Sequence, residues 1–141
     1  MKVLLDTNII VDNLAGRDEF EESRIILENC ESGSVTGIVS TVTIMDVIYI
    51  LRKYLNQARI REAVQMLMQI VDVASVHRID ITNALAGGIS DIEDAVQASV
   101  ALRNGADYII TRNAKDFAKS PLTALTPDAF LHILHNVTSE N

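Results

Sequence analysis

Aspartates recur in this sequence where apolar segments end, which is where an α/β protein positions reactive groups. Asp6 directly follows the apolar run at 3–5, and Asp94 lies near the start of a segment with helical periodicity. Carboxylates that face one crevice repel each other, so they must take up protons or share a cation. Mg²⁺ and Mn²⁺ prefer such oxygen ligands, whereas Zn²⁺ usually binds His or Cys. The candidate chemistry is therefore metal-dependent hydrolysis.

Asp6 and Asp94 are the strongest candidates because neither position needs an aspartate for the fold. Ser90 and Glu93 have the spacing of a capping box, which would already cap the helix that carries Asp94. Asp91 lies three residues before Asp94 and shares its helix face, while Glu93 is expected to point elsewhere. The same face continues with small groups that would leave space for a ligand: Gln97, Ala98 and Ala101.

The other acids have structural alternatives of similar weight. Asp91 could instead complement a helix dipole, and Asp116 could be a turn residue. Asp46 could be a solvated helix position, although it stands within the apolar segment 44–48. The histidines, His77, His132 and His135, show no metal-ligand spacing.

The elements that must position these acids alternate between strands and helices. Strands are expected at 3–5, 37–40, 73–76, 106–111 and 122–125, and helices at 8–14, 20–30, 41–54, 59–71, 80–86, 91–103 and 127–135. Glycines at 16, 33 and 105 are expected to stop three of the helices. This alternation predicts a layered α/β protein with a mainly parallel sheet of four to five strands. A single domain is expected over 1–137, with a disordered tail at 138–141.

The bulk composition favours a soluble, cytoplasmic protein. No apolar stretch approaches the ~20 residues needed to span a membrane, and the N-terminal apolar run is too short for a signal peptide. Cys30 is the single cysteine, so no intrachain disulfide can form, and it is expected to be a spectator. The net charge of −7 counts against a general nucleic-acid coating role. It counts less against a metal-dependent nuclease, whose site must itself be acidic.

Four segments resemble, in the expected order, the motifs of PIN domains: 4–10, 40–46, 91–98 and 106–117. The resemblance extends from Met1 to about Phe130. It implies a three-layer α/β/α fold, an acidic pocket that binds Mg²⁺ or Mn²⁺, endoribonuclease activity on RNA, and often a homodimer. Many small bacterial members are VapC-type toxins held inactive by a cognate antitoxin, which makes an antitoxin an implied partner.

The resemblance assigns roles to the candidate residues. The catalytic set is Asp6, Asp46, Asp94 and Asp116, with Asp6 and Asp94 as metal ligands. The supporting residues are Thr7, Asn8, Asp91, Thr111 and Asn113. Arg112 and Lys115, with Arg52 and Lys53, are candidate RNA contacts, although each could equally be an ordinary solvated charge.

Two positions depart from the family pattern and keep an alternative open. The second acid is commonly Glu but is Asp46 here, and the last motif often has Asp where this chain has Asn113. The alternative is a catalytically weak or inactive PIN-fold module that binds RNA or a protein partner. Receivers and haloacid dehalogenase-type phosphatases also place Asp after a first strand. The dehalogenase pattern needs a second acid where Asn8 stands, and the receiver acid pair is missing from the N-terminal segment.

The apolar stripes over 41–71 exceed what one sheet face needs. A helical hairpin with a break near Asn56 is expected there, and we expect a homodimer to form through it.

Overall fold

A five-stranded sheet forms the centre of the computed structural model, which describes residues 1–14 and 20–139. The strand order is β3-β2-β1-β4-β5, and every neighbouring pair is parallel. The strands are β1 (Lys2–Leu5), β2 (Thr36–Ser40), β3 (Asp72–Ala74), β4 (Tyr108–Ile110) and β5 (Ala124–Leu125). The predicted α/β class and the parallel sheet are confirmed. Because all strands run the same way, their carboxyl ends meet at one edge of the sheet.

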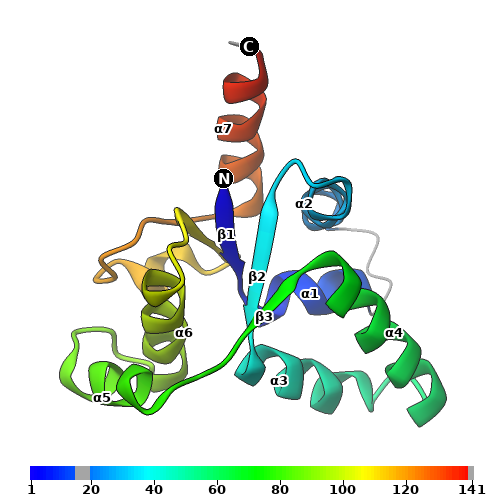
Figure 1. Cartoon of the computed structure of the whole chain (residues 1–141), viewed down its shortest axis with the longest axis horizontal. Helices are drawn as coiled ribbons and strands as arrows, with labels where there is room; N and C mark the ends of the chain where they lie inside the picture. Colours follow the sequence, from blue (N-terminus) through cyan, green and yellow to red (C-terminus); the bar gives the residue numbers. More distant parts are fainter. Residues whose placement is uncertain (15–19, 140–141) are drawn as a thin grey trace.

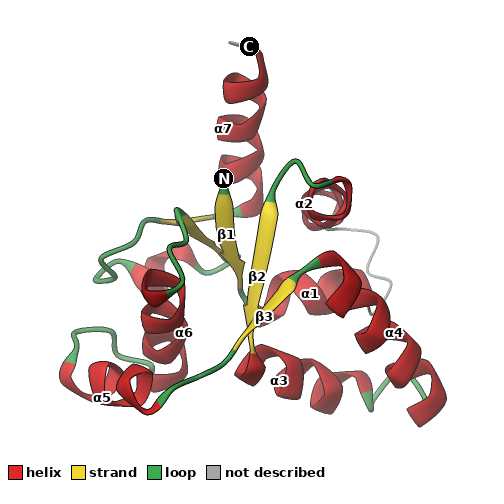
Figure 2. Cartoon of the chain, viewed as in Figure 1, coloured by secondary structure: helices red, strands yellow, loops and turns green. Residues whose placement is uncertain are grey.

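Helices cover both faces of this sheet and complete the three predicted layers (Figures 1 and 2). On one face lie α5 (Arg78–Ala86) and α6 (Ile92–Arg103). The hydrophobic cluster on the other face draws on α1 (Thr7–Leu14), α2 (Glu21–Ser32), α3 (Thr41–Leu51), α4 (Gln57–Ile70) and α7 (Pro127–Ser139). None of the described helices is both long and apolar enough to span a membrane.

β1 is fixed in the middle of the sheet because its side chains are buried on both faces. Val3 and Leu5 belong to the cluster under α1 to α4, whereas Leu4 belongs to the cluster under α6. All three are fully buried, and burial of each such side chain contributes about 1.5–3 kcal/mol. The continuous apolar run is typical of a parallel strand covered on both sides. The position of Asp6, directly after this strand, is therefore set by the core.

Several element boundaries differ from the predicted ones. α3 ends at Leu51 rather than at 54, and Asn56 caps α4 by accepting a hydrogen bond from the Arg59 backbone at 2.9 Å. The last helix continues to Ser139, so the first two residues of the predicted tail are helical. The predicted helix stop at Gly16 lies outside the described residues. Gly33 ends α2 with a φ of +84°, the left-handed conformation that favours glycine.

The start of α6 differs from the prediction by one position, with consequences for the acids. The side chain of Asp91, rather than that of Ser90, caps the helix by accepting the backbone N–H of Asp94 at 2.9 Å. Glu93 and Asp94 therefore both fall in the first turn of α6. The predicted capping box at Ser90 is wrong because Asp91 is an equally good N-cap residue and lies one position further on.

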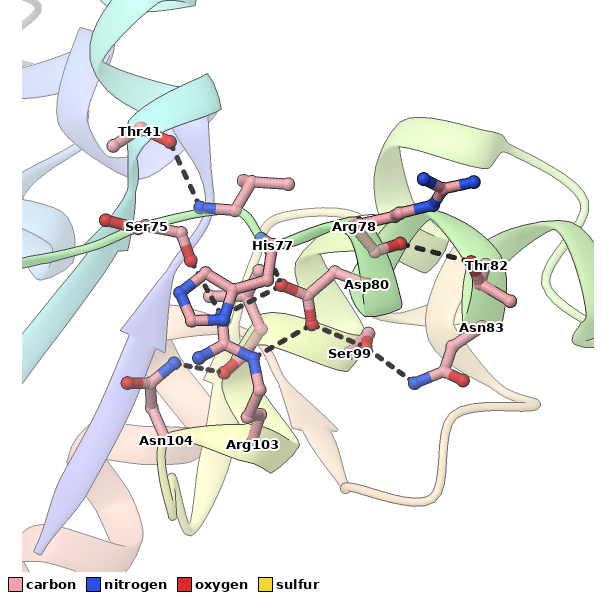
Figure 3. Close-up of polar contacts among 12 residues, drawn as sticks. Thr41, Ser75, His77, Arg78, Asp80, Thr82, Asn83, Ser99, Arg103 and Asn104 are labelled. Atoms are coloured by element: carbon pink, nitrogen blue, oxygen red, sulfur yellow. Dashed lines mark hydrogen bonds and ion pairs between the residues drawn. The ribbon is translucent and has the colours of Figure 1, made fainter.

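A buried ion pair fastens α5 to α6 (Figure 3). Asp80 is fully buried in α5 and pairs with Arg103 at the end of α6 at 2.8 Å. The same carboxylate accepts hydrogen bonds from Ser99 Oγ at 2.8 Å and from the His77 backbone N–H at 2.8 Å. Arg103 also donates to the Ser75 carbonyl at 2.7 Å. The helix that carries Asp94 is thus anchored at its far end.

Cys30 is a packing residue of α2. Its side chain is 7% exposed, and a Cβ atom added at Gly37 would lie 2.7 Å from its sulfur. Burial raises the pKa of the thiol to about 11, so it stays protonated near neutral pH. These surroundings are those of an inert structural cysteine, in keeping with the spectator expectation.

Candidate metal centre

A cleft of ≈ 500 Å³ opens at the edge of the sheet where β1 and β4 end. Six carboxylates line it, together with a single cation among the described lining residues, Arg112. The lining consists of Asp6, Thr7, Asn8, Val11, Asp46, Tyr49, Ile50, Asp91, Glu93, Asp94, Arg112, Asn113 and Asp116. Acids from β1, α3, α6 and the segment after β4 therefore converge on one space.

Asp6 is held in place by donors on three neighbouring residues. Thr111, fully buried after β4, donates its hydroxyl to Asp6 Oδ2 at 2.8 Å. The Thr7 backbone N–H donates to Oδ1 at 2.8 Å, and the Asn8 side chain donates to Oδ2 at 3.3 Å. Burial raises the pKa of Asp6 above its ordinary value, and these hydrogen bonds oppose the rise. The described hydrogen-bond partners of this carboxylate include no arginine or lysine.

Asp94 faces the same repulsive surroundings. Burial is the largest cause that raises its pKa, to about 6, and the charges of Asp6, Asp91 and Asp116 add to the rise. Asp6 and Asp94 are 88 positions apart in sequence, yet the charge of Asp6 contributes to the raised pKa of Asp94 across the cleft.

Glu93 joins the cleft, although the sequence analysis expected it to point elsewhere. It forms a side-chain hydrogen bond with Asp46, which requires a proton between the two carboxyl groups. This bond, followed by burial and the charges of Asp46, Asp91 and Asp6, raises the pKa of Glu93 to about 7. The prediction assigned the site to the helix face shared by Asp91 and Asp94 and left Glu93 out. In the structure Asp91 is the N-cap, and Glu93 lines the cleft beside Asp94 in the first turn of α6.

The segment after β4 contributes Asn113 and Asp116 to the cleft, while Lys115 lies elsewhere. Lys115 lines an adjacent hollow that shares Asp91, Asp94 and Asp116 with the cleft. Arg52 and Lys53 are not among the lining residues; the Arg52 guanidinium lies 5.8 Å from the ring centroid of Tyr49, which does line the cleft. Tyr49, Ile50 and Val11 are lining residues that the sequence analysis missed, because apolar helix positions carry no signal for a site.

The α6 face beyond Asp94 is packed, not open as predicted. Ala98 and Ala101 belong to the hydrophobic cluster under the sheet. Gln97 is buried and donates to Thr43 Oγ1 at 2.6 Å, and Thr7 donates to the same oxygen at 3.3 Å. This chain of polar contacts forms a floor that ties α6, α3 and the Asp6 loop together.

The donor set fits a hard divalent cation. The lining acids supply oxygen ligands, and the charges of neighbouring acids contribute, after burial or a hydrogen bond, to the raised pKa values of Asp6, Glu93 and Asp94. Within the described part of the chain, no three His, Cys, Asp or Glu side chains form a ready-made metal cluster. Mg²⁺ in proteins keeps several of its waters and takes only one or two carboxylates directly.

Comparisons with known proteins identify the family and the fold. A family model described as a PIN domain matches residues 2–115. A VapBC2 structure from Rickettsia felis, bound to a promoter DNA fragment, has a TM-score of 0.68 at 18% identity, covering 89% of this chain and 98% of that chain. A toxin–antitoxin complex from Klebsiella pneumoniae has a TM-score of 0.68 at 25% identity, covering 89% and 97%.

A more distant fold relative has a described activity. VapC20 from Mycobacterium tuberculosis, a sarcin–ricin loop cleaving toxin, has a TM-score of 0.59 at 14% identity, covering 76% of this chain and 86% of that chain. A comparison with curated proteins gives no match.

Proposed function

The chain belongs to the PIN domain family, and on this premise we propose that it is a Mg²⁺- or Mn²⁺-dependent endoribonuclease that hydrolyses RNA phosphodiester bonds. The observation that carries the proposal is the convergence of six carboxylates on one cleft, with Asp6 oriented by Thr111 and no basic partner among its described contacts. A cleft this acidic repels RNA unless a cation is bound, which is the condition for metal-dependent phosphate chemistry.

The proposed roles follow from the positions of the side chains. Asp6 and Asp94 hold the metal, and Asp46 contributes directly or through water. When bound, the cation lowers the pKa of a coordinated water and offsets charge on the scissile phosphate. Asp91, Asp116 and Asn113 lie around these metal-binding residues and complete the site. Thr111, Thr7 and Asn8 orient Asp6. We add Glu93 to this set, because its hydrogen bond to Asp46 places it at the same space.

The departure from the family pattern at Asp46 is offset in this geometry. Asp46 is one methylene shorter than the Glu common at this point of the motif. The longer side chain of Glu93 reaches it from α6, so the pair brings two carboxyl groups to that side of the cleft. Asn113 lines the cleft without a charge, and Asp116 supplies an acid three residues later. Glu93 and Asp116 therefore maintain the number of carboxyl groups at the cleft despite the two departures from the family pattern.

Cleavage of RNA by the purified protein tests the proposal. The wild-type chain is expected to cut single-stranded RNA with added Mg²⁺ or Mn²⁺ and to stop when EDTA is added. Asp6→Asn should abolish cleavage without unfolding the protein. Asp72→Asn is a matched control, because this exposed aspartate starts β3, which β2 separates from β1, and does not line the cleft.

Two outcomes of the cleavage assay would contradict the nuclease. Cleavage that survives Asp6→Asn would remove Asp6 from the mechanism. A wild-type protein that binds RNA or a protein partner but does not cut would favour the alternative of an inactive PIN-fold module.

We also propose that the protein is the toxin of a toxin–antitoxin pair that acts in the cytoplasm. Two of its fold relatives come from VapBC and toxin–antitoxin complexes. A reading frame for a small protein directly upstream of this one would support an antitoxin. Co-expression of the two proteins should then yield a complex in which RNA cleavage is suppressed.

The α3–α4 hairpin is the surface that we propose for a homodimer. Large apolar side chains remain exposed on it: Met45, Tyr49, Tyr54, Met66 and Met68, each at least 53% exposed. Sedimentation equilibrium should give a dimer for the wild type, and Met66→Lys with Met68→Lys should shift it to a monomer. A monomeric wild type at micromolar concentration would remove this surface as a self-interface.

A further inference from the structure

A buried aspartate outside the acid cluster pairs with the cation of the cleft. Asp12 lies in α1, is 1% exposed, and forms an ion pair with Arg112 in which Nε lies 3.1 Å from Oδ2. Arg112 itself is partly exposed, at 36% of its side chain, and lines the acidic cleft. One charge is thus inside the protein and the other at the surface of the site.

Two further contacts hold Arg112. Its guanidinium carbon lies 4.4 Å from the ring centroid of Phe20, a cation–π arrangement. Its backbone N–H donates to Asn8 Oδ1 at 3.3 Å, and the Asn8 side chain donates in turn to Asp6. Side chain and backbone of Arg112 are therefore both tied to residues around the cleft. A long, rotamer-rich side chain held in this way has lost much of its freedom before any ligand arrives.

The charge distribution makes Arg112 the residue best placed to bind a phosphate group. Among the described lining residues it is the only cation beside six carboxylates. Arg112 also lines a neighbouring groove of ≈ 330 Å³, whose other charged lining residues are Glu22 and Asp128. In both hollows the other charged residues among the described lining are acids, so a polyanion is attracted only to this guanidinium. With Nε engaged by Asp12, the terminal edge of the fork can bind phosphate oxygens.

We propose that Asp12 is a positioning residue that fixes Arg112 as the phosphate-binding group at the rim of the cleft. The inference rests on the proposed ribonuclease function and names the residue that sets the geometry of its substrate contact. A buried ion pair is a poor device for stability, because desolvation offsets most of the attraction. Its value here is that a guanidinium held in advance binds a phosphate at a lower entropic cost.

The sign of the effect of Asp12→Asn separates positioning from simple electrostatics. The substitution removes a negative charge near the cleft, so electrostatics alone predicts tighter binding of RNA. Positioning predicts weaker binding, because Arg112 loses the carboxylate that holds it. The probe is a fluorescein-labelled single-stranded RNA oligonucleotide. Its binding to the full chain is measured by fluorescence anisotropy, with Ca²⁺ as the divalent cation. Asp72→Asn provides the control for the loss of one charge that lines neither the cleft nor the neighbouring groove.

The expected result is a several-fold higher Kd for Asp12→Asn and for Arg112→Met. The Kd of Asp72→Asn should equal that of the wild type. Adding Asp12→Asn to Arg112→Met should cause no further loss, because Asp12 acts through Arg112. The slope of log Kd against log salt should fall by about 0.7 in Arg112→Met, the value for one phosphate contact on a single strand. In cleavage assays Asp12→Asn should raise KM and leave kcat unchanged. Thermal melts of each variant check that it is folded.

Two results would overturn the proposal. One is Asp12→Asn binding RNA as tightly as, or more tightly than, the wild type. The other is an equal loss from Asp12→Asn with and without Arg112, which would indicate a merely structural role. If the wild type binds RNA in this Arg112-dependent way but never cleaves it, the proposed ribonuclease function is wrong and the positioning role of Asp12 still holds. A wild type that neither binds nor cleaves RNA would overturn both.

Discussion

The carboxyl groups of Asp46 and Glu93 share a hydrogen bond across the cleft, although they come from helices on opposite faces of the sheet. Two ionised carboxylates cannot make such a bond, so it forms when Glu93 is protonated. The pKa of Glu93, raised to about 7, places this proton near physiological pH. At the proposed metal site, a divalent cation would therefore compete with this proton.

Binding of Mn²⁺ near neutral pH is expected to release a proton from this pair, because a cation and a proton compete for the same oxygens. Calorimetric titrations in two buffers of different ionisation enthalpy would count the protons released. The release should decrease in Glu93→Gln, and the apparent metal affinity of the wild type should rise with pH through about 7. Equal heats in both buffers would show that the pair holds no displaceable proton.

The metal-free protein is expected to become more stable as pH falls from 8 towards 5. The pKa values of Glu93 and Asp94, about 7 and about 6, exceed their ordinary values of 4.5 and 3.8. In this window the folded state binds more protons than the unfolded state, so the free energy of unfolding rises as pH falls. Thermal melts with EDTA should show this trend, and saturating Mn²⁺ should reduce it. A melting temperature that falls as the pH falls from 8 towards 5 would contradict the raised pKa values of Glu93 and Asp94.

Asp94→Asn should stabilise the metal-free protein while it weakens metal binding. The substitution removes a repelled carboxylate from the cleft, which we expect to add about 1 kcal/mol at neutral pH after solvent screening. That corresponds to about 3 °C in Tm for a chain of this size. Asp116→Asn, an acid on the same cleft with no side-chain hydrogen bond recorded among the described residues, provides a comparison. A lower Tm for Asp94→Asn in EDTA would mean that Asp94 serves the fold.

Thr111→Val is expected to weaken Mn²⁺ binding about tenfold, in the usual range for loss of a residue that orients a ligand. The change removes the hydroxyl that donates to Asp6 at 2.8 Å and opposes the rise in the pKa of that buried acid. Thr111→Ser keeps the donor and should retain the affinity. Mn²⁺ affinity can be followed by the electron paramagnetic resonance signal of the free ion. Equal losses in both variants would point to packing rather than to the hydrogen bond.

Asp80→Asn should destabilise the protein by about 3 kcal/mol, because Arg103 would lose a buried partner. Burial raises the pKa of Asp80, but hydrogen bonds from Arg103, the His77 backbone and Ser99 outweigh it and lower the pKa below 3.8. This contribution is present above the unfolded pKa and is lost as pH falls through the lower folded value.

Urea unfolding at several pH values tests the role of Asp80. The difference in the free energy of unfolding between wild type and Asp80→Asn should decrease below about pH 4, with the exposed Asp72→Asn as control. If this difference stays constant down to the acid unfolding transition, an ionised Asp80 is not its source.

The order of the elements and the position of Asp6 could be predicted because they depend on local patterns. The run at 3–5 is apolar throughout, and the alternation of strands and helices leaves few arrangements for the sheet. The convergence of acids on one edge then follows from parallel strands. Gly33 was correctly expected to end a helix, because the left-handed conformation favours glycine.

The errors arose where two local solutions were equally good or where partners came from distant elements. Ser90 and Asp91 are both strong N-cap residues, and the sequence alone does not distinguish between them. Glu93 was left out because it is off the i,i+3 face of Asp91 and Asp94, yet it lines the cleft. Gln97 appeared free to line a pocket, but its partner Thr43 lies 54 residues away on another helix. The pairing of Asp12 with Arg112 spans 100 positions and left no local signal.

The central place of β1 has a consequence for the protein during its own synthesis. Its first strand is completed only by β4, and Asp6 receives its hydroxyl donor from a residue 105 positions later. A ribosome adds residues one at a time, and at about 5–20 per second the wait for the partner strand lasts many seconds. Through most of translation the nascent chain therefore carries Asp6 without the hydroxyl donor and the neighbouring strand that hold it in the folded protein. Under the proposed nuclease function, the site is incomplete until at least Thr111 has been synthesised.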